Sequence, residues 1–166
     1  MNISIGNLSV RCLQSDVDNQ SDVEALFYYV NFEEKVVSHP VDQELDDLRE
    51  GQALLRQVQP DRFFIYARPP SSPDDSLLKE VLKCCFKNAF ELCERHDITS
   101  IALPLTSGVG VHCPVSTAAA AATEAVVEKA KDEGSLRTIR FAVSSANEFN
   151  TLPRYLIRGA ASLEVA

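Results

Sequence analysis

The stretch ITSIALPLTSGVGVHCPVSTAAAAATEAVVEKA, residues 98–130, decides the fold class of this chain. Apolar side chains alternate over residues 98–105, which predicts a strand. Gly108 and Gly110 then interrupt the apolar pattern, and Pro114 opposes further strand pairing. The alanine-rich sequence that follows predicts a long helix. The stretch therefore indicates a strand, a glycine-containing loop and a helix.

A strand that ends in Gly-x-Gly and leads into a helix is a place where an anion can bind. Glycines let backbone N–H groups approach a ligand, and the first turn of the helix adds N–H groups without intrahelical partners. A tight strand-to-helix turn without a ligand is the alternative interpretation of the same residues. We expect Ser116 or Thr117 to cap the helix, which should continue to about Lys131.

Helical and strand patterns alternate along the rest of the chain. The expected strands span residues 3–10, 23–31, 62–67 and 137–144. The expected helices span residues 41–58 with an interruption near Gly51, residues 72–95 with Ser72 as the cap, and residues 153–158. This order predicts a three-layer α/β/α sandwich with a mixed, largely parallel sheet. Residues 1–158 should form one domain, and residues 159–166 a loose tail.

Charge and composition limit the classes of partner. The chain has 166 residues, 45% of them hydrophobic, and a net charge of −8 from 24 acidic and 16 basic residues. This charge argues against a broad surface for nucleic acid or for an anionic membrane, since both need a dense positive field. The sequence shows no apolar run long enough to span a bilayer and no signal peptide.

The five cysteines indicate neither a disulfide framework nor a metal site. Their number is odd, their spacing is irregular, and no CxxC motif is present. We expect no metal and no cofactor, and mostly buried thiols; Cys85 and Cys93 should share one helix face. A reducing compartment, the cytoplasm or the nucleus, follows as the expected location. Cys113 lies beside the glycine loop, but no histidine–carboxylate partner is evident for it.

Two common phosphate-binding loops do not fit residues 108–113. A Walker loop needs GxxxxGK followed by Ser or Thr, and no lysine closely follows Gly110. A dinucleotide fingerprint needs GxGxxG, but Cys113 stands where the third glycine belongs, and the motif comes late in the chain. ATP or GTP hydrolysis and Rossmann-type dehydrogenase activity are therefore disfavoured.

A third family fits better. The order LPLTSGVGVHCP, helix, RFAV strand resembles the macro domain, the ADP-ribose-binding fold. Four other segments resemble macro-domain segments in the same order. IGNLS (residues 5–9) resembles the Gly-Asp-Ile-Thr segment, and DVEALFYYVN (residues 22–31) resembles the DVDAIVNAAN segment. VDQEL (residues 41–45) resembles the Val-Asp-x-x-Ile start of a helix, and RFFIYARPP (residues 62–70) resembles the strand that follows. The resemblance covers nearly the whole chain, and the common order carries it.

The resemblance implies a ligand, ADP-ribose or an ADP-ribosylated protein, and a set of residues that hold it. The ligand-binding residues that it implies are Asn7, Leu8, Asn31, Asp42, Thr106, Ser107, Gly108, Val109, Gly110 and Val111. In the family's hydrolases an aspartate at the position of Asp42 helps to activate water. Asn31 and Asp42 are therefore the candidate catalytic residues.

The sequence departs from the macro-domain pattern on one side of this implied site. Asn7 replaces the family's adenine-recognising aspartate, Tyr28 replaces an asparagine near the distal ribose, and residues 38–40, Ser-His-Pro, replace a glycine-rich stretch. Three functions remain open: a module that binds ADP-ribose, a degenerate domain that contacts a protein partner, and an ADP-ribosyl hydrolase.

Overall fold

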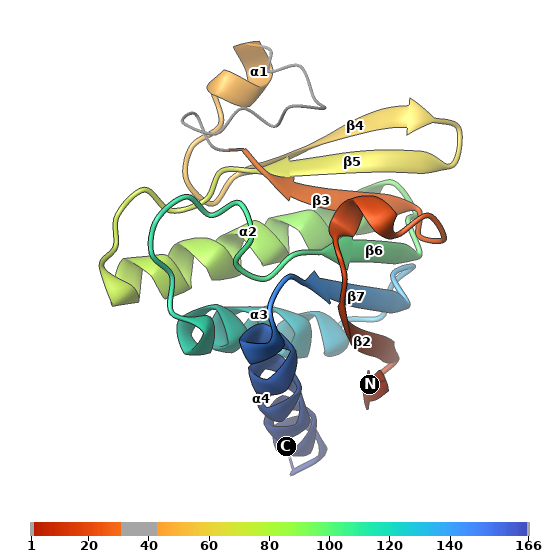
Figure 1. Ribbon diagram of the computed structural model, residues 1–166. Coiled ribbons are helices and arrows are strands. Elements are labelled where there is room, and N and C mark those ends of the chain that lie inside the picture. Colours follow the sequence, from red (N-terminus) through yellow and green to blue (C-terminus); the bar gives the residue numbers. More distant parts are fainter. Residues whose placement is uncertain (1, 31–42, 166) are drawn as a thin grey trace.

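The computed structural model describes residues 2–30 and 43–165. A mixed sheet with the order β1-β2-β7-β6-β3-β5-β4 forms its centre (Figure 1). Its strands are β1 (Asn2–Ile5), β2 (Leu8–Gln14), β3 (Ala25–Tyr29), β4 (Ala53–Gln59), β5 (Arg62–Ala67), β6 (Ser100–Leu103) and β7 (Thr138–Val143). The five inner strands, β2, β7, β6, β3 and β5, are parallel to one another. The two outer strands are antiparallel to their neighbours, β1 to β2 and β4 to β5. The predicted α/β sandwich with a largely parallel sheet is confirmed.

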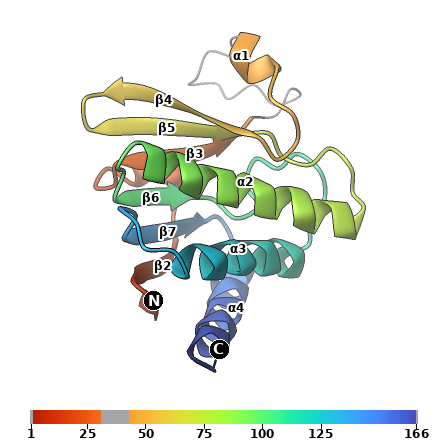
Figure 2. The same cartoon turned by 180° about the vertical axis from the view of Figure 1, so that it is seen from behind.

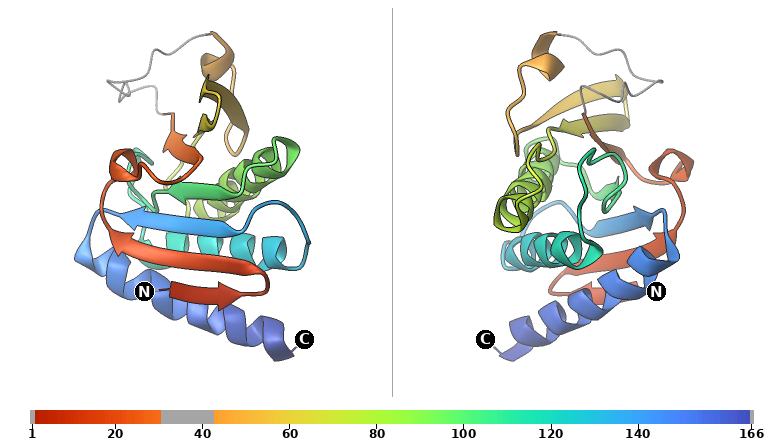
Figure 3. Two further views of the ribbon diagram at one scale, coloured as in Figure 1. Left: turned by 90° about the vertical axis from the view of Figure 1, so that its right-hand side faces the viewer. Right: turned by 60° about the vertical axis from the view of Figure 1, so that its left-hand side comes forward.

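The long helices lie on one face and along the β1–β2 side of the sheet (Figure 1). The two helices α2 (Asp75–Arg95) and α3 (Val115–Ala130) lie side by side on one face (Figure 2). The short η1 (Val17–Asn19) lies in front of the other face, and α1 (Gln43–Asp46) lies beyond β4 (Figure 1). The last helix, α4 (Ala146–Val165), packs against α3 and runs alongside β1 and β2 (Figure 3).

The buried face of α2 contains both Cys85 and Cys93, as the sequence predicts. Leu78, Leu82, Cys85, Ala89 and Cys93 are all fully buried. The predicted start of the helix is wrong, because Asp74 and not Ser72 occupies the cap. The Asp74 carboxylate accepts hydrogen bonds from the N–H groups of Ser76 and Leu77, at 3.1 and 3.4 Å. These bonds satisfy donors that have no partner within the helix.

The predicted caps of α3 are also wrong. Pro114 stands at the cap position and no side chain bonds the first N–H groups, since Ser116 and Thr117 already belong to the helix. Most of the alanines in its first turns are buried. Their small side chains allow α3 to lie close to both α2 and α4.

The helix predicted over residues 41–58 is wrong for most of its length. After α1, Gly51 adopts a φ of +86°, and β4 then pairs antiparallel with β5, so that Leu55 lies opposite Ile65. Leu45, Leu48 and Leu55 recur at a spacing that fits a helix, but a short apolar segment also fits a strand. A neighbouring strand with an open edge decided the outcome, and this neighbour is not visible in a local pattern.

Both ends of the chain differ from the prediction. The single strand expected over residues 3–10 is the hairpin β1–β2, which turns at Gly6 and Asn7. The short helix and loose tail expected after residue 152 are one long helix, α4, with Pro153 inside it. Leu152 and Leu156 are fully buried, and further apolar side chains along α4 pack on the same core. This packing keeps residues 159–165 helical.

Candidate functional site

Three segments meet where β2, β6 and β7 end. Because these strands are parallel, the residues after each of them lie at the same edge of the sheet, which we call the carboxyl edge. They enclose a pocket of about 200 Å³, here the carboxyl-edge pocket. Its lining consists of Ser15, Asp16, Val17, Asp18, Phe27, Tyr28, Tyr29, Pro104, Ser107, Gly108, Ala142 and Ser144. Ligands of parallel sheets bind at this edge.

The glycine loop, residues 106–111, forms part of one wall of the pocket through Ser107 and Gly108. Gly108 and Gly110 have φ values of +93° and +89°, a region that other residues rarely adopt. The Val109 N–H donates to the Thr106 carbonyl at 3.1 Å, and the Val109 side chain is buried. The N–H groups of Ser107, Gly108, Gly110 and Val111 have no acceptor among the described residues. Such a row of open N–H groups can receive an anion.

The buried Tyr29 side chain packs against this loop. Its hydroxyl group donates to the Leu105 carbonyl at 3.2 Å, and the residue is only 3% exposed. Burial raises the pKa of the Tyr29 hydroxyl well above its usual range. A Cβ atom at Gly108 would lie 3.6 Å from the Tyr29 Cβ, so the loop rests directly on the tyrosine. The loop is therefore held on its inner side while its outer side stays open.

Asp16 is a site residue that the sequence analysis missed. It is the second residue after β2, it is exposed, and it lines the carboxyl-edge pocket together with Gly108. Its carboxylate makes no hydrogen bond to another residue in the described part of the chain. The signal was present in the sequence, because SDVD (residues 15–18) follows an apolar strand as Gly-Asp-Ile-Thr does in macro domains.

The structure places Asn7 and Leu8 at the opposite edge of the sheet, away from the glycine loop with which the sequence analysis groups them. Asn7 lies in the β1–β2 turn, and Ser9 pairs with Thr138 at the amino end of β7. Leu8 is a buried core residue. The strand expected over residues 3–10 is divided by this turn, and residues 8–14 form the first strand that pairs in parallel with a neighbour.

Tyr28 and Asp18 connect β3 to η1 across the front of the sheet. The Tyr28 hydroxyl donates to an Asp18 carboxylate oxygen at 2.5 Å. Burial, and then this hydrogen bond to a carboxylate, raises the pKa of Tyr28. Both residues line the carboxyl-edge pocket, so their bond narrows the pocket on the side of β3.

The candidate catalytic residues, Asn31 and Asp42, lie outside the described residues, as do residues 38–40. The structure brings together the remaining predicted loop residues, Thr106 to Val111. They separate the carboxyl-edge pocket from a second hollow of about 560 Å³, which includes Val109, Gly110 and Val111 in its lining.

Arg68 lies in the lining of this second hollow and holds α1. One guanidinium nitrogen donates to the carbonyl groups of Leu45 and Asp46, both at 3.2 Å. Burial lowers the pKa of Arg68. The guanidinium therefore stabilises the end of the short helix that follows residues 31–42.

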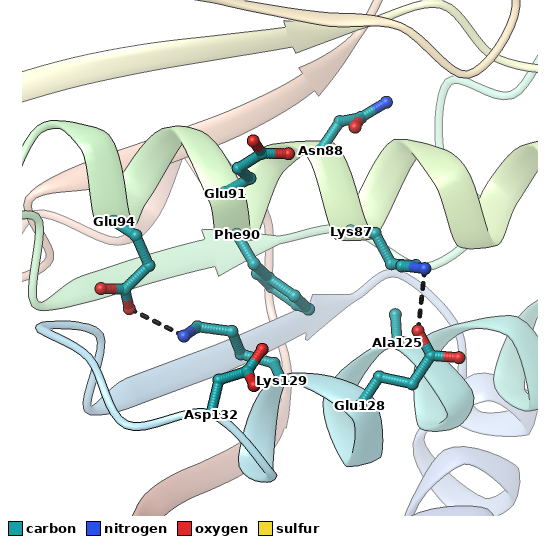
Figure 4. A pocket seen from close by; sticks show the side chains of 9 residues that line it. All are labelled: Lys87, Asn88, Phe90, Glu91, Glu94, Ala125, Glu128, Lys129 and Asp132. Atoms are coloured by element: carbon teal, nitrogen blue, oxygen red, sulfur yellow. Dashed lines mark ion pairs between the residues drawn. The ribbon is translucent and has the colours of Figure 1, made fainter.

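A third hollow, of about 490 Å³, lies between α2 and α3 on the far face of the sheet (Figure 4). Its charged side chains bind one another: Lys87 pairs with Glu128, and Lys129 with Glu94, both at 2.9 Å. We interpret it as a groove of helix packing, because its cations are already matched by carboxylates.

The described residues hold no cluster of side chains suited to a metal ion. Within the same residues, no helix has the length and apolar character needed to cross a membrane. All five cysteines are free, and three of them are buried, as predicted; Cys84 is exposed. Burial raises the pKa of Cys12 to about 11 and that of Cys85 to about 12. These two thiols are therefore poor nucleophiles.

Solved structures of similar fold identify the class of fold. A macrodomain from Oceanobacillus iheyensis with ADP has a TM-score of 0.74 and 18% identity, over 95% of both chains. A variant of that macrodomain is solved with ADPR, at a TM-score of 0.72. A Trypanosoma brucei macrodomain in complex with ADP has a TM-score of 0.69 and 15% identity, over 89% of this chain and 68% of the other.

The macro domain of ganglioside-induced differentiation-associated protein 2 is a further match. Its TM-score is 0.72 and its identity 19%, over 89% of this chain and 82% of that chain. Neither a protein-family model nor a curated protein sequence matches the chain. The chain therefore has the macrodomain fold, which confirms the resemblance seen in the sequence.

Proposed function

We propose that this chain is a module that binds ADP-ribose, either free or attached to a protein. One observation carries the proposal: Ser107 and Gly108, whose N–H groups have no acceptor among the described residues, line the same carboxyl-edge pocket as Asp16. ADP-ribose carries both complementary groups, an anionic diphosphate and an adenine with an amino donor. The solved macrodomains with ADP and ADPR support the same chemistry at this fold.

Each part of the ligand has a matching group. The N–H groups of Gly108, Gly110 and Val111 would receive the diphosphate, helped by the positive end of α3. The Asp16 carboxylate would accept a hydrogen bond from the adenine amino group. The second hollow, beyond Val111, offers space for the distal ribose and its attached side chain.

The acidic side chains of the carboxyl-edge pocket should limit its affinity for ADP-ribose. The carboxyl-edge pocket is lined by Asp16 and Asp18, and no lysine or arginine is among the described residues that line it. The diphosphate would therefore depend on backbone dipoles without a cationic partner. We expect binding in the micromolar range, roughly −8 kcal/mol.

Titration calorimetry with ADP-ribose tests this proposal. Micromolar binding with a stoichiometry near one would support it, and adenosine alone should bind more weakly because it lacks the diphosphate. An absence of heat with millimolar ADP-ribose would overturn it. Salt should weaken the binding only modestly, because no side-chain cation takes part.

A second function, contact with a protein partner after loss of the nucleotide, is favoured by one observation. Tyr28 and Tyr29 stand where the family segment has asparagine and alanine, and Tyr28 is bound to Asp18 within the pocket. Tyr28→Asn separates the two functions. Binding of ADP-ribose by the variant and not by the natural chain would favour the second function. The hydrolase hypothesis depends on Asn31 and Asp42 and stays a prediction.

A further inference from the structure

Glu148 is a buried carboxylate that the proposed binding function does not yet use. It is 2% exposed and belongs to the first turn of α4. No lysine or arginine within the described residues forms an ion pair with it. A buried carboxylate is costly unless hydrogen bonds compensate for the lost water. Its hydrogen-bond partners therefore indicate what it does.

The first turn of α4 contains a modified capping box. The sequence Ser145-Ala146-Asn147-Glu148 has the S-x-x-E pattern, and the Glu148 N–H donates to the Ser145 hydroxyl at 3.1 Å. In the usual box the glutamate side chain returns to the backbone N–H of the capping residue. Here one oxygen of the Glu148 carboxylate instead accepts from the Ser144 N–H, at 3.1 Å. The carboxylate is thus directed toward the end of β7.

The other oxygen of this carboxylate reaches the glycine loop. It accepts a hydrogen bond from the hydroxyl group of Thr106, the residue with which the loop begins. The Thr106 carbonyl in turn accepts from the Val109 N–H and so closes the turn that contains Gly108. Glu148 therefore connects the start of α4, the end of β7 and the base of the loop.

Both connected segments line the carboxyl-edge pocket, Ser144 from one side and Ser107 with Gly108 from the other. We propose that Glu148 is a positioning residue, which fixes the glycine loop so that its N–H groups face the diphosphate. The inference rests on the proposed binding of ADP-ribose. Because the Thr106 hydroxyl is used by Glu148, the loop presents the ligand with backbone donors and not with this side chain.

Hydrogen exchange tests the positioning role without any ligand. In Glu148→Gln only one of the two bonding positions of the side chain can still accept, so the link between Ser144 and Thr106 weakens, and the hydrogen-bonded Val109 N–H, which closes the turn, should exchange about tenfold faster than in the natural chain. Thr106→Val removes the bond to the Glu148 carboxylate and keeps the shape of the side chain, and it should speed exchange of the same N–H group. The double variant should exchange little faster than either single variant, since both substitutions disrupt the same connection between Glu148 and the glycine loop.

Glu94→Gln is the matched control. Glu94 is also a carboxylate that organises a loop, but it bonds Ser135 and Leu136 at the other edge of the sheet. This variant should leave exchange over residues 106–111 unchanged. Equal effects of Glu148→Gln and Glu94→Gln on that segment, or none from Glu148→Gln, would overturn the inference.

The effect of Glu148→Gln on the affinity for ADP-ribose, compared with its effect on the affinity for adenosine, separates this inference from the proposed function. Glu148→Gln should weaken ADP-ribose about tenfold and adenosine by less than twofold, because only the diphosphate depends on the loop. Equal losses for both ligands would indicate a general loss of structure and would overturn the positioning role. If the natural chain fails to bind ADP-ribose, the proposed function fails, whereas the exchange experiment still decides whether Glu148 fixes the loop.

Discussion

The two ends of the parallel strands, the amino edge and the carboxyl edge of the sheet, differ in whether the loop N–H groups beside them have acceptors within the protein. At the amino edge, Glu24 accepts from the Thr99 N–H at 2.8 Å, and Glu94 accepts from the N–H groups of Ser135 and Leu136 at 2.8 and 3.0 Å. At the carboxyl edge the buried Glu148 binds the Thr106 side chain and leaves the N–H groups of the loop open.

This difference shows where the fold reserves donors for a ligand. At the amino edge the N–H groups of Thr99, Ser135 and Leu136 have acceptors within the protein, so these contacts stabilise the fold. Equivalent groups at the carboxyl edge are oriented but not satisfied, which is the arrangement expected of a binding site. Substitutions at the two edges should therefore separate stability from affinity.

The largest expected effect is on stability, at the amino edge. Burial raises the pKa of Glu94, but hydrogen bonds from Leu136, Lys129 and Ser135 outweigh it and lower the pKa to about 2. The folded pKa lies below the unfolded one, so the unfolded chain binds more protons and stability falls as the pH drops from about 4.5 to about 2. After allowance for solvent screening, this amounts to about 2 kcal/mol at pH 7.

Urea unfolding of Glu94→Gln between pH 2 and pH 7 measures this contribution. The variant should lose most of it at pH 7 and should differ little from the natural chain at pH 2. Its affinity for ADP-ribose should not change. A stability difference that is independent of pH would contradict the role assigned to the Glu94 charge.

The next effect concerns the loop itself. Gly108→Ala should weaken ADP-ribose binding about tenfold, because alanine disfavours a φ of +93° and the loop would shift to another conformation. Gly6→Ala is the matched control at the amino edge, where φ is +57°. It should lower the melting temperature without changing the affinity. Retained affinity in Gly108→Ala would show that the ligand does not use this loop.

A smaller effect is expected at Asp16. Asp16→Ala should weaken ADP-ribose about fivefold through loss of a hydrogen bond to an exposed carboxylate. The corresponding inosine compound lacks the amino group, so it should bind the variant and the natural chain equally. Asp132→Ala removes one charge from the far face and controls for net charge. A loss of affinity that is equal for the two bases would contradict adenine recognition by Asp16.

The smallest effect is expected at Asn7. Asn7→Asp introduces the residue that the family pattern places in the Gly-Asp-Ile-Thr segment, yet the affinity should change by less than about twofold, within the range of surface substitutions. Calorimetry with ADP-ribose measures it. An affinity gain of about fivefold or more, beyond that range, would return the adenine site to the β1–β2 turn.

Much of the site-bearing architecture could be predicted because its signals are local. The glycine loop, the helix after it and the buried stripe of α2 follow from glycine positions and from apolar periodicity. These patterns hold because a parallel strand and its following helix must bury the same side chains in any such fold.

The remaining differences have nonlocal causes. Residues 53–59 became β4 because β5 offers an open edge, and α4 continued to Val165 because its side chains meet the core. Asp16 was missed because the sequence does not show which of two short apolar segments is the first parallel strand. Glu148 was missed because its S-x-x-E pattern is usually a closed local box.

By itself, the sequence determined the macrodomain class of fold and the loop at Gly108 and Gly110, since glycine and alternating apolar residues act over a few positions. Only the tertiary structure decided that Asp16 lines the pocket beside that loop and that the buried Glu148 bonds the first residue of the loop. Asp16 and Gly108 line one pocket, and Glu148 bonds Thr106 at the start of the same loop, because the parallel strands that precede these residues end at one edge of the sheet.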